Sequence, residues 1–247
     1  MKKLLLIFVP AFMCFAPLLA SGDDHQNNSP LFYGQSIGFM TADAPAVLMA
    51  MDKWRKTETG KAAPNTVVLL ENIVNGDYQS THGVNIFYPT GAAIDASTEI
   101  LRGNKEWSDF QKTLRSHVVF EWENTYAITR AKANEGDVSA NNPVSIVYLI
   151  TVTDSDEFIP AFNELWNSNA IQNFPGAVYF GSSIASGTMA GTHFVTFVAD
   201  SRGKLTDAIM AMQSTDEMET YMASASKSRI LEATNMFAEL KRWANGS

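Results

Sequence analysis

The chain has 247 residues, with 18 lysines and arginines against 26 aspartates and glutamates, which gives a formal net charge of −8. This acidic balance argues against nucleic acid or an anionic membrane surface as a partner. Hydrophobic residues make up 46% of the sequence, which is ample for a packed core and argues against a disordered chain.

The N-terminus has the three parts of a secretory signal peptide: a basic start at Lys2 and Lys3, an apolar run over residues 4–20, and small residues up to Gly22. The run is short for a membrane span. We therefore expect residues 1–22 to be removed, with cleavage between Ala20 and Gly22. The mature protein would then be exported, periplasmic or secreted, and would keep no stable membrane anchor.

The loss of this segment changes the composition. Without Lys2 and Lys3, 16 basic residues face 26 acidic ones, a net charge of −10. Cys14 is the only cysteine of the chain, so the mature protein would have no disulfide, no thiolate catalysis and no cysteine-ligated metal. Residues 23–30 are polar and form the expected flexible tether.

Beyond the tether, the sequence repeats itself at an offset of 111 residues. Pro64 corresponds to Pro175 (175 − 64 = 111), and His82 corresponds to His193 (193 − 82 = 111). A repeat of this length suits a small α+β unit better than a solenoid repeat. We therefore predict a tandem duplication with a first repeat at 31–130, a linker at 131–143 and a second repeat at 144–247. Near the repeat ends, the matching residues are Glu121, Asn124 and Tyr126 with Glu232, Asn235 and Phe237.

The hydrophobic periods follow one order in both repeats: strand, helix, strand, glycine-containing turn, strand, two helices and a final strand. In the first repeat we expect strands at 35–41, 66–73, 82–88 and 118–128, and helices around Val47 to Trp54, at 92–101 and at 106–114. In the second repeat we expect strands at 145–152, 177–182, 193–199 and 229–240, and helices around Phe158 to Trp166, at 204–212 and at 216–225. The composition of residues 231–240 also suits a helix. The order βαββαβ is that of the ferredoxin-like unit.

Two such units in one chain resemble the dimeric α+β barrel superfamily. The resemblance rests on element order, length and duplication, and it implies an α+β fold in which two antiparallel sheets pack around a pseudo-twofold axis as a barrel with helices outside. Related families include quinol and antibiotic-biosynthesis monooxygenases, haem-degrading monooxygenases, dye-decolourising peroxidases and stress-responsive proteins. The Asn, Trp and His set of the haem-degrading members does not map onto this sequence.

The paired Thr-His motifs are the weak candidates for a catalytic role. His82 and His193 each follow a threonine at the start of the third strand, where an imidazole could act as a base or as a haem or metal ligand. The alternative is that each imidazole only fixes a hairpin. Period two places His82 on the face of Val84 and Ile86, which favours a position outside the cavity.

The opposite face of the same strands provides the candidate ligand site. Gly83 is small where the second repeat has Phe194, so we expect a lopsided cavity that is roomier in the first repeat. The candidate ligand-binding residues are Gly83, Asn85, Phe87, Phe194 and Thr196.

Two functions are compatible with these features. The first is an exported barrel that binds a small apolar molecule or a protein partner without catalysis and without a cofactor. The second is a monooxygenase or a haem-dependent oxidoreductase of the α+β barrel type, in which haem is possible. No histidine or carboxylate spacing typical of a metal site is present, and no phosphate loop, zinc-protease or serine-esterase motif occurs. The identity of the ligand and any further oligomerisation stay open.

Overall fold

The computed structural model describes residues 30–133, 138 and 142–244. The expected signal peptide, most of the tether and part of the linker therefore lie outside the described residues. Among those that are described, no helix is long and apolar enough to cross a membrane.

Both halves have the element order that the sequence predicts. The first half contains β1 (Phe32–Met40), α1 (Ala44–Arg55), α2 (Glu58–Ala62), β2 (Thr66–Val74), β3 (His82–Tyr88), α3 (Gly91–Leu101), α4 (Lys105–Arg115) and β4 (Val119–Lys132). The second half contains β5 (Val144–Val152), α5 (Ser155–Asn167), α6 (Asn169–Gln172), β6 (Ala177–Ala185), β7 (His193–Ala199), α7 (Arg202–Gln213), α8 (Asp216–Ala225) and β8 (Arg229–Trp243).

The differences from the predicted elements have physical causes. The helices α2 and α6 have five and four residues, which is too short to show a helical period. The segment β8 is a strand although its composition also suits a helix. It pairs with β2 on one side and with β5 on the other, and this pairing overrides the weak intrinsic propensity.

The eight strands form a closed barrel in the order β1-β3-β2-β8-β5-β7-β6-β4. All eight neighbouring pairs are antiparallel. The strands β1 and β5 lie four places apart in this ring and therefore run in the same direction. As a consequence, the β2–β3 and β6–β7 hairpins turn at the same end of the barrel, which we call the mouth.

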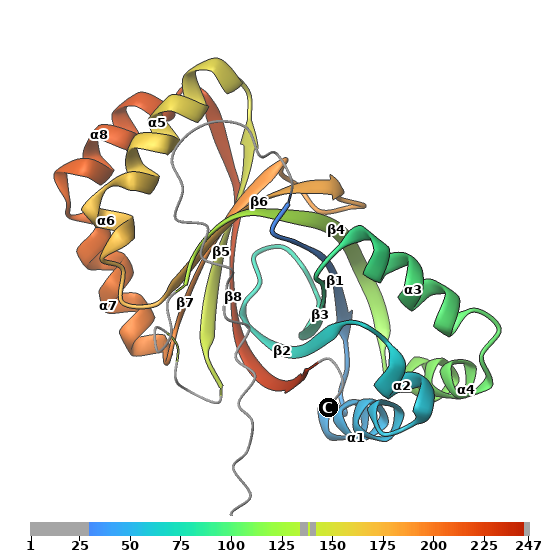
Figure 1. Cartoon of the computed structure of the whole chain (residues 1–247). Helices are drawn as coiled ribbons and strands as arrows, with labels where there is room; N and C mark the ends of the chain where they lie inside the picture. The colour runs from blue at the N-terminus through green and yellow to red at the C-terminus, as the bar shows by residue number, and fades with distance from the viewer. Residues whose placement is uncertain (1–29, 134–137, 139–141, 245–247) are drawn as a thin grey trace, which may run out of the picture.

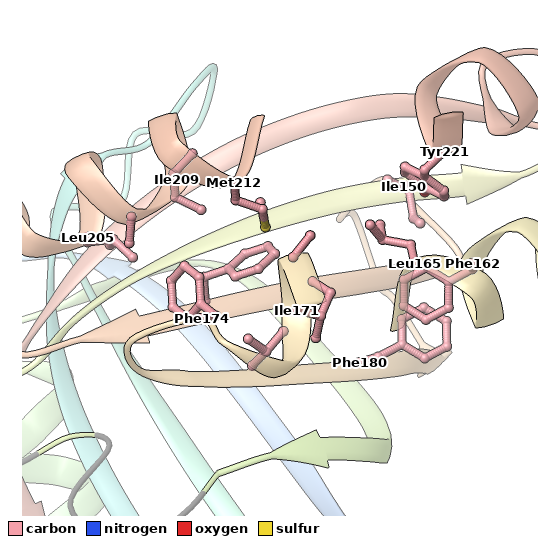
Figure 2. Packing of buried hydrophobic residues seen from close by; sticks show 14 of the residues in the cluster. Ile150, Phe162, Leu165, Ile171, Phe174, Phe180, Leu205, Ile209, Met212 and Tyr221 are labelled. Carbon is pink, nitrogen blue, oxygen red and sulfur yellow. The ribbon is translucent and has the colours of Figure 1, made fainter. Parts of the chain in front are cut away.

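Helices cover the outside of the barrel in two groups (Figure 1). The helices α1–α4 lie on one side and α5–α8 on the other. Each group packs on the outward face of its own strands, for example Phe158, Phe162 and Leu205 against Val178 and Phe180 in the second half. Figure 2 shows how the aromatic and aliphatic side chains of this layer interleave between the helices and the sheet.

The inward faces of the strands form a separate core. Tyr126, Ile128, Leu149 and Phe194 make up one interior cluster. A second interior cluster, Val68, Leu70 and Phe237, adjoins it through Phe87 and Val147, which pack against both. The protein thus has two helix–sheet layers outside the barrel and one mixed core inside it, and an eight-stranded barrel is wide enough for side chains or for one small ligand.

Candidate active site in the barrel interior

The five candidate ligand residues all face the barrel interior. Alternation along β3 turns Gly83, Asn85 and Phe87 inwards, and Phe87 packs in the interior clusters. Alternation along β7 does the same for Phe194 and Thr196. Because β3 and β7 lie four places apart in the ring, the two groups of residues approach the interior from opposite sides.

A polar row crosses the first-half wall of the interior. Asn124 on β4 pairs with Ser36 on β1, which in turn pairs with Asn85 on β3. The Ser36 hydroxyl donates to Asn85 Oδ1 at 2.5 Å, and it also hydrogen-bonds the phenol of Tyr126. Burial raises the pKa of Tyr126 far above its ordinary value, so its phenol stays protonated. The row therefore consists of neutral groups in a mostly apolar surrounding.

Sequence reasoning missed most of this row. Asn124 was visible only as a repeat match, and Ser36 carried no signal at all. Simple alternation along β4 would place Phe120, Trp122 and Tyr126 on one face of the strand, but the structure separates Phe120 from the other two. A bulge between Gly38 and Phe39 shifts the register with β4, so that Phe120 packs edge-on against Phe39 outside the barrel while Trp122 points inwards.

Aromatic rings of the interior occupy the space that a side chain at a neighbouring glycine would need. A Cβ at Gly38 would lie 2.1 Å from the Trp122 ring, one at Gly34 would lie 2.2 Å from Tyr126, and one at Gly181 would lie 2.3 Å from the Ala127 carbonyl and 2.5 Å from the Phe194 ring. At these three positions a side chain would have to displace a ring or a backbone atom, so glycine is the residue that fits without a shift.

This packing changes the expectation of a roomier first half. Gly83 is indeed small where Phe194 is large. However, Trp122 fills the first half where the second half has Ala233, so the contrast at Gly83 is offset by a residue on β4, two strands away. Ala233 and Met189, which comes from the β6–β7 hairpin, both pack against the same interior cluster.

Several buried amides of the interior have unpaired atoms. Asn235 is 1% exposed, and neither its Nδ2 nor its Oδ1 has a hydrogen-bond partner among the described residues. Asn124 and Asn72 each have an unpaired Oδ1 in the same described set. An unpaired buried polar group is destabilising by about 1–3 kcal/mol. Such groups are rare in native proteins unless a water or a ligand satisfies them.

The candidate catalytic histidines lie outside the interior. Each Nδ1 hydrogen-bonds the preceding threonine hydroxyl at 2.9 Å. The His82 ring stacks on Phe39 and the His193 ring stacks on Phe180, both in the helix–sheet layers. Burial lowers the pKa of both imidazoles, and Glu71 partly offsets the shift at His82. Both rings are therefore neutral at pH 7, but they face away from the polar row.

The threonines of these pairs join neighbouring strands. Thr81 Oγ1 accepts from the Thr41 backbone N–H, and Thr192 Oγ1 accepts from the Val152 N–H, both at 3.1 Å. This geometry matches the hairpin-fixing alternative for the Thr-His motif.

The residues around His193 do not fit a haem. The His193 ring packs against Phe180 and Phe158, with ring centroids 5.6 and 6.4 Å away, and Phe162 lies against both phenylalanines. All three phenylalanines are at most 5% exposed, and Figure 2 shows Phe162 and Phe180 within this layer. A porphyrin bound to His193 would have to displace this layer. The described residues contain no group of three or more His, Cys, Asp or Glu side chains that could hold a metal ion.

A shallow groove of about 220 Å³ lies between α5 and α8. Its lining includes Glu164, Asp216 and Glu217 beside Leu165 and Tyr221. Its acidic and open character distinguishes it from the apolar barrel interior, and its lining includes none of the candidate residues named above.

The comparisons with known proteins concern the fold. No protein-family model matches the chain, and no curated protein matches it. A putative monooxygenase from Fusobacterium nucleatum superposes with a TM-score of 0.60 at 12% identity, covering 90% of this chain and 97% of its own. A putative monooxygenase from Lactobacillus acidophilus gives 0.54 at 10% identity, covering 89% and 98%. A mutant chlorite dismutase from Candidatus Nitrospira defluvii gives 0.55 at 12% identity, covering 86% and 92%.

These similarities show the fold alone: the chain shares with these proteins an α+β fold with a closed antiparallel barrel, the fold that the sequence resemblance implies. They also correct the first functional expectation. The solved structures that share this fold over nearly the whole chain are named as a monooxygenase, an anthrone oxidase-like protein and a chlorite dismutase. A binding protein without catalysis is therefore the wrong main interpretation, and the oxidoreductase alternative is the better one.

Proposed function

We propose that this protein is an oxidoreductase that oxidises a small, largely apolar molecule inside the barrel with molecular oxygen and without haem. The observation that carries the proposal is the polar row of Asn124, Ser36 and Asn85 beside Tyr126, set in an interior of aromatic and aliphatic side chains. The enzyme names of the structural neighbours support it. A few polar groups among apolar side chains are the usual lining of a small-molecule site.

The row can assist oxidation of an acidic C–H bond. When such a carbon next to a carbonyl loses its proton, which finally leaves in the product water, negative charge develops on the carbonyl oxygen. The Asn85 side-chain N–H is the donor of the row that can stabilise this charge, since the Tyr126 O–H donates to Ser36, and the exclusion of water strengthens the interaction. For anthrone, the net change replaces two C–H bonds by one C=O bond, and oxygen is reduced, with one atom entering the product and the other leaving as water.

We further propose that the two halves arose by duplication and are related by a pseudo-twofold axis along the barrel. The strand orders β4-β1-β3-β2 and β8-β5-β7-β6 are equivalent, and the 111-residue offset links Ser36 to Val147 and Asn85 to Thr196 in matching registers. Duplication explains why only one wall carries the full polar row. We also propose that the mature protein acts outside the cytoplasm, as Lys2, Lys3 and the following apolar run indicate.

Oxygen uptake with anthrone as the probe tests the oxidase function. We expect the mature chain to consume oxygen and form anthraquinone faster than a protein-free blank. Asn85→Leu should lower kcat/KM about tenfold or more, because it removes a donor that acts on developing charge. The matched control is Glu164→Gln in the α5–α8 groove, which should leave kcat/KM unchanged. Uptake equal to the blank would contradict the proposed function.

A further inference from the structure

Asn235 is a buried amide without any partner in the described residues. It is 1% exposed, and both its donor and its acceptor are unpaired. It lies on β8 opposite Val147 of β5, and a Cβ at the turn residue Gly76 would be 3.7 Å from its Oδ1. The amide therefore sits just below the mouth, on the wall opposite the polar row.

The neighbours of Asn235 along β8 and across to β5 offer no polar side chain. Ala233 and Phe237 flank it on the inward face of β8, and Val147 lies across from it. A buried water usually makes about three hydrogen bonds to protein groups. These three side chains provide no hydrogen-bond partner for a water bonded to Asn235. A ligand brings its own apolar body and can pair with the amide through a single polar group.

The corresponding position of the first half is different. Asn124 faces the hydroxyl of Ser36 instead of Val147, and only its Oδ1 is unpaired. The second-half amide is thus the one without any local role. Two residues along the same face, Ala233 takes the place of the bulky Trp122, which leaves less side-chain volume next to Asn235 than next to Asn124.

We propose that Asn235 anchors the ligand through a hydroxyl or carbonyl group at the edge of an uncharged, flat, apolar molecule. The amide can donate to a carbonyl and accept from a hydroxyl, so one side chain can hold either form. An uncharged ligand fits because Val147, Ala233 and Phe237 would leave a charge unpaired. Met189 is a flexible side chain from the β6–β7 hairpin that packs on the interior cluster, and it is the group that moves aside to admit the ligand. This inference rests on the proposed function for the location of the substrate.

Equilibrium binding of 1-naphthol and of naphthalene tests the anchor without turnover. The two probes share a flat apolar body and differ by one hydroxyl. The parent should bind 1-naphthol about tenfold more tightly than naphthalene, as expected for one buried hydrogen bond. Asn235→Leu should bind both with equal affinity. The control Glu164→Gln, in the α5–α8 groove outside the barrel, should keep the tenfold preference.

Thermal unfolding of the ligand-free variants provides the second readout. Removal of an unsatisfied amide should leave the Tm of Asn235→Leu unchanged or raise it by about 2–4 °C. If the leucine of Asn235→Leu prevents folding, Asn235→Ala replaces it as the test variant. This variant should also abolish the preference for 1-naphthol over naphthalene. The proposal is overturned if the parent binds neither probe or binds both equally, if either Asn235 variant keeps the preference, or if Asn235→Leu lowers Tm by several degrees. Tenfold selectivity without oxygen uptake would contradict the oxidase function alone.

Discussion

The two hairpins at the mouth of the barrel occupy corresponding places but are held very differently. In the β2–β3 hairpin, Glu121 accepts from the backbone N–H groups of Gln79 and Ser80 at 2.6 Å, and Trp122 Nε1 donates to the Ser80 hydroxyl at 3.1 Å. In the β6–β7 hairpin, the corresponding residues are Glu232, which is exposed and makes no hydrogen bond within the described part of the chain, and Ala233.

This difference indicates that the two hairpins differ in how firmly they are held. Asn72 and Asn75 add further hydrogen bonds from their amides to Ser80, so the first hairpin is fixed against its own strands. The second hairpin instead extends Met189 into the interior cluster. The β2–β3 hairpin is therefore held at the mouth by several hydrogen bonds. The β6–β7 hairpin contributes the flexible side chain of Met189 instead.

The largest effect is expected from removal of the indole that supports the first hairpin. Trp122 is 6% exposed, so Trp122→Ala should lower the free energy of unfolding by about 3–5 kcal/mol. Chemical denaturation measures this loss. Ala233→Gly at the corresponding position is the control and should cost about 1 kcal/mol or less. A loss below 1 kcal/mol for Trp122→Ala would mean that the indole does not support the interior.

A smaller effect is expected where the glycines accommodate rings. Gly38→Ala would place a Cβ 2.1 Å from the Trp122 ring and should destabilise by about 1–3 kcal/mol. Gly203→Ala in α7, where a Cβ meets nothing within 4 Å, should instead stabilise by about 0.4–1 kcal/mol. In the double variant Trp122→Ala/Gly38→Ala, the cost of the alanine at 38 should vanish. Strict additivity of the two single changes would show that the ring does not occupy this space.

The carboxylate that holds the first hairpin should contribute less. Glu121→Ala removes two bonds to backbone N–H groups and should cost about 1–2 kcal/mol, since one of the two bonds is exposed. Glu232→Ala should change stability by less than about 0.5 kcal/mol. Amide hydrogen exchange gives a direct readout. In the parent, residues 79 and 80 should exchange more slowly than residues 190 and 191, and Glu121→Ala should abolish that difference.

The smallest effect concerns pH. Burial places the pKa of His82 and His193 below the unfolded value of about 6.5. The unfolded state therefore binds more protons as pH falls, so stability is complete above pH 6.5 and declines gradually below it. The double variant His82→Gln/His193→Gln should show a shallower decline between pH 7 and pH 5. An equal decline in the variant would assign the pH dependence to other groups.

The fold was largely predictable because its signals are local and occur twice. Alternation placed β3 and β7 at their observed bounds, and the inward face of these strands contained all five candidate ligand residues. The polar row was not predictable, since it depends on the register between β4, β1 and β3 and on a bulge at Gly38. The unpaired state of Asn235 likewise depends on which neighbours the closed barrel provides, and a single sequence contains no sign of it.

Methyl NMR with 1-naphthol tests most directly whether the barrel interior is the ligand site. We expect the resonances of Val147, Leu149 and Met189 to shift on titration, because these methyl groups lie in the interior or over it. The methyl groups of Val47 and Leu205 in the helix–sheet layers should not shift. Shifts confined to Ala161 and Leu165 would place the ligand in the groove between α5 and α8 and would contradict the account.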